Sequence, residues 1–194
     1  MSTVFRWQEL AQRIQFLEKQ SGHSISTDED IEAFEQENNI TFPEDYKEFC
    51  KIFGTGIANN WLMILCPGSF ALSQYQEGIG ITIYEIQESP SGNPECDQQK
   101  INVLENAFVF ADDLGCGHFF IWDLRTYRNE DKCYDIYWAV WDAPESKILE
   151  DDLKFIGRSF FEIVQDFCYG TRNRELYETD EDIPIEYVYQ QFSL

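Results

Sequence analysis

Residues 31–56 constrain the fold most, because their turn residues and apolar spacing predict two short helices joined by a tight turn. Ser26 and Thr27 are suited to cap the first helix, since their hydroxyls accept hydrogen bonds from its free backbone N–H groups. Ile31 and Phe34 lie three residues apart and share its inward face. A short helix with one apolar face is therefore expected here.

The second helix is marked at both ends. Pro43 suits its first turn, where the missing N–H of proline costs no hydrogen bond. Gly54 and Gly56 are expected to take positive backbone angles that end the helix before the chain turns away. Four apolar residues between these ends recur at three- and four-residue steps, which places them on one buried face. They are Tyr46, Phe49, Cys50 and Phe53.

The N-terminus carries another apolar stripe at helical spacing. Its members are Val4, Trp7, Leu10, Ile14 and Leu17. This pattern predicts a helix that packs on the domain and ends near Ser21 and Gly22.

From Trp61 onward the pattern changes to that of strands. Residues 61–65 form a compact apolar run, and three isoleucines further on alternate with other residues. They are Ile79, Ile81 and Ile83. A period of two predicts strands with one buried face. The turn residues of 89–94 then predict a loop that extends as far as Gln99.

Aromatic runs between Phe108 and Trp141 predict three further strands. Turns are expected at residues 112–117 and 129–132. Consecutive strands with such short connections should pair antiparallel.

The last part of the chain predicts a closing helix and an acidic tail. Asp151 or Asp152 is suited to cap the helix, and Gly170 is expected to end it. Its shared face contains Leu153, Ile156, Phe160, Ile163, Val164 and Phe167. In the tail, the apolar spacing after Pro184 fits either a short helix or a strand.

The order of these elements predicts an α+β fold: a single domain with a mainly antiparallel sheet, flanked by N-terminal helices and a C-terminal helix. A chain of 194 residues with 43% hydrophobic content is long enough for one core. Residues 1–174 are interpreted as this domain, including its N-terminal helix, and residues 175–194 as an acidic extension docked on it.

The charge excludes some partners. The chain has 36 acids and 14 bases, a formal charge of −22. Such a surface repels nucleic acid and anionic lipid and attracts a basic partner at short range. The alternative is that the charge only keeps the protein soluble.

Cysteines and hydropathy indicate a reducing compartment. The six cysteines lie mostly inside apolar runs, and no apolar stretch approaches the ~20 residues that span a bilayer. The N-terminus interleaves charges too closely for a secretory signal. The protein is therefore expected to be cytoplasmic, with reduced cysteines.

Catalytic motifs are missing from the sequence. It has no GxSxG elbow, no glycine-rich phosphate loop and only two histidines. Cys116 and His118 are two residues apart, but no CxxC or HxxxH supplies further metal ligands, so a turn without chemistry is the favoured interpretation. No cofactor, no metal site and no enzymatic activity are expected.

In this order the helices and turn of residues 31–56 resemble the SUKH superfamily, and three further segments support the resemblance. The run from Phe108 to Asp123 is similar to the family's central hairpin, with an FA-containing strand, a glycine turn and an aromatic strand ending in an acid. Residues 135–140 resemble its next strand, and residues 159–163 the start of its closing helix. The resemblance covers roughly residues 24–170.

The resemblance implies a binding protein, since many bacterial SUKH proteins neutralise a cognate toxin, frequently a nuclease, by binding it. A protein partner that is a basic toxin domain is expected on this interpretation, and the acidic charge fits it. A regulatory or scaffold domain, like the eukaryotic relatives, is the alternative. An enzyme that uses carboxylates alone ranks last, because no nucleophile, metal set or cofactor loop accompanies them.

Four residues are candidates for partner contact. Asp112, Asp113 and His118 lie in an expected turn, and Trp61 follows two asparagines at a loop edge, where an aromatic anchor is suited to recognition. The alternative for these residues is a solvated turn and a packed tryptophan.

Overall fold

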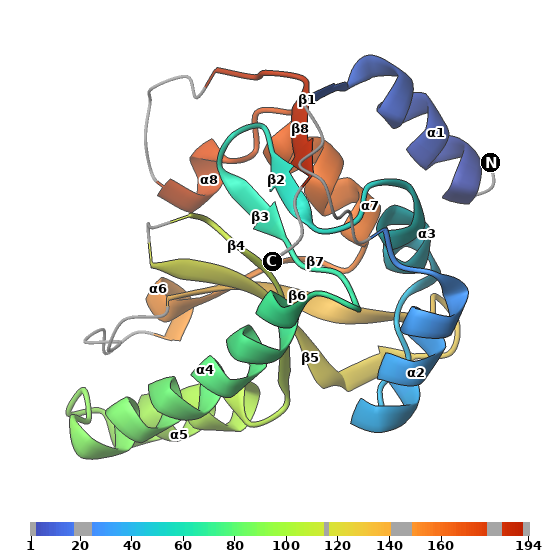
Figure 1. Ribbon diagram of the computed structural model, residues 1–194. Helices are drawn as coiled ribbons and strands as arrows, with labels where there is room; N and C mark the ends of the chain where they lie inside the picture. The colour runs from blue at the N-terminus through green and yellow to red at the C-terminus, as the bar shows by residue number, and fades with distance from the viewer. Residues whose placement is uncertain (1–2, 18–24, 115–116, 141–148, 178–183, 192–194) are drawn as a thin grey trace. The chain divides into compact units, whose positions relative to one another are not determined.

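The computed structural model describes residues 3–17, 25–114, 117–140, 149–177 and 184–191 (Figure 1). Contacts between residues divide the chain into two units. The first unit combines Met1–Ser69 with Ser159–Leu194, and the second is Phe70–Arg158. Each unit has its own helices and strands.

The helices of the first unit come from both ends of the chain. They are α1 (Thr3–Arg13), α2 (Asp28–Asn38), α3 (Glu44–Ile52), α7 (Phe160–Ile163), the π-helical turn η1 (Val164–Cys168) and α8 (Arg174–Tyr177). Thr27 caps α2 in a capping box: the Asp30 N–H donates to its hydroxyl oxygen (3.1 Å), and the Thr27 N–H donates to the Asp30 carboxylate (2.9 Å). The predicted helix start is confirmed, and Pro43 stands one position before α3, as its N-cap.

Trp7 lies at the centre of the first unit's aromatic core. Its indole is fully buried, and four phenylalanine rings lie within 4.6–5.8 Å of it, measured between ring centroids. They are Phe49, Phe53, Phe160 and Phe161. The indole N–H also donates to the backbone carbonyl of Asp45 (2.7 Å). The apolar stripes predicted for α1 and α3 therefore meet α7 in one cluster.

The strands of the first unit are ordered β1-β8-β2-β3. They are β1 (Gln15–Leu17), β8 (Val188–Gln191), β2 (Gly56–Ala58) and β3 (Leu62–Ile64). β1 pairs parallel to β8, and the other pairs are antiparallel. The predicted N-terminal helix is thus too long, because the chain turns into β1 after Ile14. At the C-terminus the strand alternative is the one observed.

Gly54 and Gly56 are glycines for different reasons. Gly54 has the predicted positive backbone angle (φ 66°). Gly56 does not, so that part of the prediction is wrong. A Cβ at Gly56 would instead lie 2.5 Å from the Gln190 carbonyl oxygen and 2.6 Å from the Tyr189 ring. Here glycine permits the close approach of β8.

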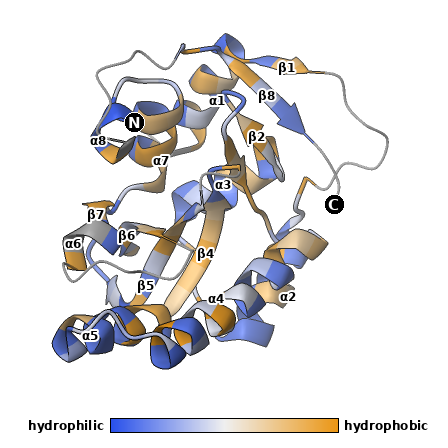
Figure 2. Ribbon diagram, turned by 90° about the vertical axis from the view of Figure 1, so that its left-hand side faces the viewer, coloured by the Kyte–Doolittle hydropathy of each residue, from blue (hydrophilic) through white to orange (hydrophobic). Residues whose placement is uncertain are grey.

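The second unit contains an antiparallel sheet ordered β4-β5-β6-β7. Its strands are β4 (Ala107–Asp112), β5 (His118–Arg128), β6 (Cys133–Val140) and β7 (Leu153–Gly157), and the short helix α6 (Leu149–Asp152) precedes β7. Figure 2 shows the hydrophobic character of β4. The three strands and the antiparallel pairing predicted between Phe108 and Trp141 are confirmed for the described residues.

The closing helix begins later than the sequence predicts. Leu153 pairs with Ala139 and belongs to β7, so the predicted helix from Asp151 or Asp152 is wrong. The helix begins after Ser159, whose hydroxyl accepts from the Glu162 N–H (3.3 Å). Apolar residues three apart, such as Leu153 and Ile156, fit a strand with an irregular register as well as a helix.

Two helices replace the strand and loop predicted for residues 79–99. They are α4 (Phe70–Glu88) and α5 (Pro94–Leu104), which lie side by side (Figures 1 and 2). The buried positions of α4 recur at helical steps, and they include Leu72, Ile79, Thr82 and Ile86. The alternating isoleucines therefore do not form a strand. Asn93 caps α5 by accepting from the Cys96 N–H (3.3 Å), and Pro94 occupies its first turn.

Gln76 attaches α4 to β4. Its side-chain amide donates to the Val109 carbonyl oxygen (2.8 Å) and accepts from the Val109 N–H (3.1 Å). The amide thus satisfies both backbone groups of one strand residue. The predicted α+β class is confirmed: the strand pairs are mainly antiparallel, and helices come before and after them.

Candidate functional site

The β4–β5 turn brings three of the four predicted contact residues together. Asp112 ends β4, Asp113 follows it, and His118 begins β5. The Leu114 N–H donates to the Asp112 carboxylate (2.8 Å), and Leu114 and Gly117 have positive φ angles of 48° and 79°. The side chain of Asp112 therefore fixes the first half of the turn. Cys116 lies outside the described residues.

Asp113 holds His118 in place. The imidazole Nδ1 lies 2.8 Å from the Asp113 carboxylate, which also accepts from the His118 backbone N–H (3.2 Å). The ring stacks on Trp138, with centroids 4.1 Å apart. Asp113 is 2% exposed, whereas the His118 side chain is 18% exposed. His118 is thus the accessible member of the pair, and Asp113 positions it.

Asp112 also has a partner on α4. Its carboxylate accepts a hydrogen bond from the Tyr75 hydroxyl. Burial, followed by the Asp112 charge, raises the pKa of Tyr75 to about 12. Burial likewise raises the pKa of Asp112, although the Leu114 N–H opposes this shift. The carboxylate is half-buried and is held by groups on two elements.

Trp61 lies in the first unit, after the β2–β3 turn. Asn59 and Asn60 form this turn with positive φ angles of 49° and 61°, and the Trp61 N–H donates to the Ala58 carbonyl (3.2 Å). Glu186 accepts from the Asn60 side chain (2.7 Å). Trp61 itself is half-buried. Backbone and side-chain hydrogen bonds hold both asparagines of the turn.

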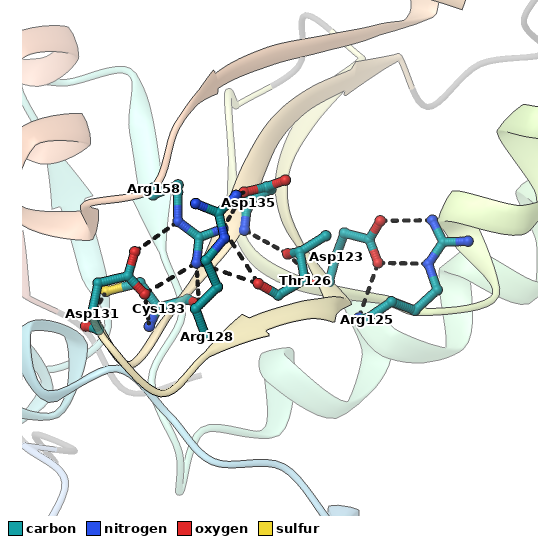
Figure 3. Close-up of polar contacts among 8 residues, drawn as sticks. All are labelled: Asp123, Arg125, Thr126, Arg128, Asp131, Cys133, Asp135 and Arg158. Carbon is teal, nitrogen blue, oxygen red and sulfur yellow. Dashed lines mark hydrogen bonds and ion pairs between the residues drawn. The ribbon is translucent and has the colours of Figure 1, made fainter.

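A second polar cluster, which the sequence did not predict, surrounds Arg158 (Figure 3). Its guanidinium donates to both Asp131 oxygens (2.9 and 3.1 Å), to Asp135 and to the carbonyl oxygens of Thr126 (3.3 Å) and Cys133 (2.7 Å). Hydrogen bonding to Arg158 lowers the pKa of Asp131. The guanidinium thus ties the end of the β5–β6 hairpin to the residue that follows β7.

Asp123 and Arg125 form a neighbouring pair on β5. The guanidinium donates to both carboxylate oxygens (2.8 and 2.6 Å), and Asp123 is 3% exposed. A bidentate pair of this kind compensates a buried carboxylate. In the Arg158 cluster the Cys133 thiol donates to the Asp131 carbonyl oxygen (3.2 Å). We interpret both the pair and the cluster as structural. In the sequence, the one signal for them is that acidic and basic residues are mixed along 123–135.

A cleft of about 260 Å³ lies between α1 and α7. Its charged lining alternates in sign, with Arg6 and Arg13 beside Glu9 and Glu162. The Arg6 guanidinium stacks over the Phe161 ring at 3.9 Å. Among the residues that the structure describes, no group of three or more histidine, cysteine or acidic side chains is arranged to hold a metal ion.

These features define an α+β domain whose polar clusters are suited to binding and to structural roles. The chain matches the model of the SMI1/KNR4 family (SUKH-1) over residues 25–166. The match covers well over half of the chain, so the protein belongs to this family, whose members are generally binding domains. Neither the curated proteins nor the solved structures contain a match.

Within the described part of the chain, no helix combines the length and the apolar character needed to cross a membrane.

Proposed function

We propose that the protein is a cytoplasmic immunity protein, which neutralises a cognate bacterial toxin by direct binding and performs no chemistry of its own. Membership of a family of interaction domains supports this proposal. Residues 1–174 are proposed to form the SUKH-like domain, and residues 175–194 the extension that docks on it through β8.

The pairing of charges is the observation that carries the proposal. Many of the described bases are engaged within the chain. Lys47 pairs with Glu35 (2.8 Å), Lys51 with Asp28 (3.2 Å), Arg125 with Asp123, Arg158 with Asp131 and Asp135, and Arg172 with Glu175 (3.2 Å). The buried Lys100 pairs with Asp152. Bases that are already paired cannot neutralise the remaining acids.

Helix α2 carries acids that these bases do not neutralise. Glu29, Glu32 and Glu37 are exposed on it, and none of them forms an ion pair with a described residue. Such carboxylates attract a basic protein and accelerate its encounter with the domain. A nuclease must present positive charge to hold phosphate, so spaced carboxylates can occupy its binding surface and exclude nucleic acid.

Asp112, Asp113, His118 and Trp61 remain the proposed contact residues. On the observed geometry Asp113 acts through His118, while the other three contact the partner. Replacing both Asp112 and Asp113 with asparagine should slow association with the partner and make the association rate less dependent on salt. A second variant, Glu29→Gln with Glu32→Gln, removes two charges from α2 and should also slow association, because these carboxylates attract the partner. An unchanged association rate in the first variant would place the interface elsewhere.

The proposal is tested by recovery and then by protection. Tagged protein is used to capture partners from its own organism at low and physiological salt, with mass spectrometry as readout. We expect to capture a basic protein with nuclease features in stoichiometric amount. Coexpression of this chain should then protect cells from that protein. Recovery of regulatory enzymes, or of no toxin-like partner at either salt, would favour the scaffold alternative.

A further inference from the structure

Helix α4 presents a continuous exposed stripe along its outer side. The positions follow each other at alternating steps of four and three residues, and each is exposed. They are Phe70, Gln74, Glu77, Ile81, Tyr84 and Glu88, which we call the α4 stripe. Phe70 is 67% exposed, Ile81 59% and Tyr84 60%. Three large apolar side chains on one helix face are more than isolated surface hydrophobics.

Gly80 lies beside this stripe in the middle of the helix. A Cβ added there would meet no atom within 4 Å. Glycine in a helix interior lowers helix stability relative to alanine. No contact with a residue that the structure describes explains why this position lacks a side chain. The open position instead lets the backbone of another molecule approach next to Ile81 and Tyr84.

The charge around the stripe indicates which kind of partner it can bind. The sequence has no lysine or arginine between Lys51 and Lys100, and Lys100 is fully buried. Glu77 and Glu88 form no ion pair with any residue in the described ranges. A second copy of this chain would bring acids against acids, so the charge disfavours self-association and favours a basic partner.

We propose that the α4 stripe binds a basic amphipathic helix of a partner protein. The apolar face of that helix packs on Phe70, Ile81 and Tyr84, and its lysine or arginine residues pair with Glu77 and Glu88. The spacing of the stripe is that of one helix face, which suits side-by-side packing with a second helix, and 19 residues of α4 offer a length of about 28 Å. This inference rests on the proposed function, because it gives the partner a specific contact surface.

The proposal is tested with a defined probe and the full chain. The probe is a synthetic 18-residue helical peptide with leucine at heptad a and d positions and lysine at the others, and the control peptide has the same composition in scrambled order. Backbone amide shifts of the labelled protein report binding. The helical peptide should bind at least about tenfold more tightly than the scrambled one, a difference of about one decade in Kd. Its shifts should centre on residues 70–88.

Variants locate the contact. Ile81→Ser with Tyr84→Ser should weaken peptide binding about tenfold, whereas Phe155→Ser removes a comparably exposed aromatic (55%) from β7 and should change nothing. Gly80→Leu fills the open position and should weaken binding while the fold is kept. Equal affinity for both peptides, shifts outside α4, or dimers held together by α4 in sedimentation would overturn the proposal.

Protection on coexpression separates this inference from the proposed function. If Ile81→Ser with Tyr84→Ser still protects cells from the captured toxin, the α4 contact is wrong and immunity stands. If the unchanged protein does not protect, the proposed function fails, whatever the peptide result.

Discussion

The acids around Arg158 and the acids on α4 differ in whether a base neutralises them. Asp131 and Asp135 accept hydrogen bonds from one guanidinium, whereas Glu77 and Glu88 have no ion pair with a described residue. In the first region charge stabilises the fold, and in the second we propose that it serves a partner. The number of acids in a sequence therefore says less about function than their pairing.

The largest expected effect is on the paired region. Arg158→Ala should lower the free energy of unfolding by about 2–4 kcal/mol, because it removes the hydrogen bonds that one guanidinium donates to Asp131, Asp135 and two backbone carbonyls. Urea denaturation measures the change. Arg128→Ala is the matched control: Arg128 is 57% exposed and has one long contact to Asp135 (3.6 Å), so its loss should cost less than about 1 kcal/mol. Equal effects would contradict the structural role of Arg158.

The stability that the Arg158 cluster contributes should depend on pH. Arg158 lowers the pKa of Asp131 below its ordinary value, so the folded state binds this proton less tightly than the unfolded state. The stabilisation is therefore present above the ordinary pKa of ~3.9 and is lost as pH falls through the lowered value. The free energy of unfolding can be measured at pH 7, 5 and 3 for Arg158→Ala and for the unchanged protein. The difference between the two should become smaller only at pH 3. A deficit that does not vary with pH would argue against this linkage.

On α4 a substitution should stabilise the isolated protein. Gly80→Ala should raise the free energy of unfolding by about 0.5–1 kcal/mol, because alanine favours the helix and its Cβ meets open space. Gly56→Ala is the opposite control and should destabilise, since its Cβ would lie 2.5 Å from a carbonyl oxygen. Thermal unfolding distinguishes the two. Destabilisation by Gly80→Ala would show that this position has an internal role.

The smallest effect on stability is expected from the unpaired acids. Glu77→Gln with Glu88→Gln should change the free energy of unfolding by less than about 0.5 kcal/mol, because these exposed carboxylates hold no partner within the described chain. Chemical denaturation at low salt is the appropriate measurement. A loss as large as that of Arg158→Ala would remove the distinction between the two regions.

Local signals in the sequence were sufficient where one residue type fixes the backbone. Thr27 predicted the start of α2, and the aromatic runs predicted β4, β5 and β6, because capping and alternation act over a few residues. The alternation of Ile79, Ile81 and Ile83 predicts a strand, and this prediction is wrong. The buried face of the helix also contains Gly78 and Thr82. Small residues on a buried face are not counted by an apolar pattern.

The candidate sites depended more on tertiary contacts. The Asp113–His118 pair could be predicted from the sequence because a short turn joins the two residues. Arg158 could not be, since its partners lie 23–32 residues earlier and meet it only when β7 joins the sheet. The sequence does not indicate the α4 stripe, because the alternating isoleucines of residues 79–83 predict a strand. A correct helix assignment would have shown its spacing.

If the unpaired acids serve a basic partner, they should accelerate its association. The association rate of the purified protein with the basic protein captured from its organism can be measured by stopped flow over a range of salt concentrations. The rate should fall steeply with salt, and Glu77→Gln with Glu88→Gln should flatten that dependence more than Glu29→Gln with Glu32→Gln. A rate that is independent of salt for the unchanged protein would contradict the claim.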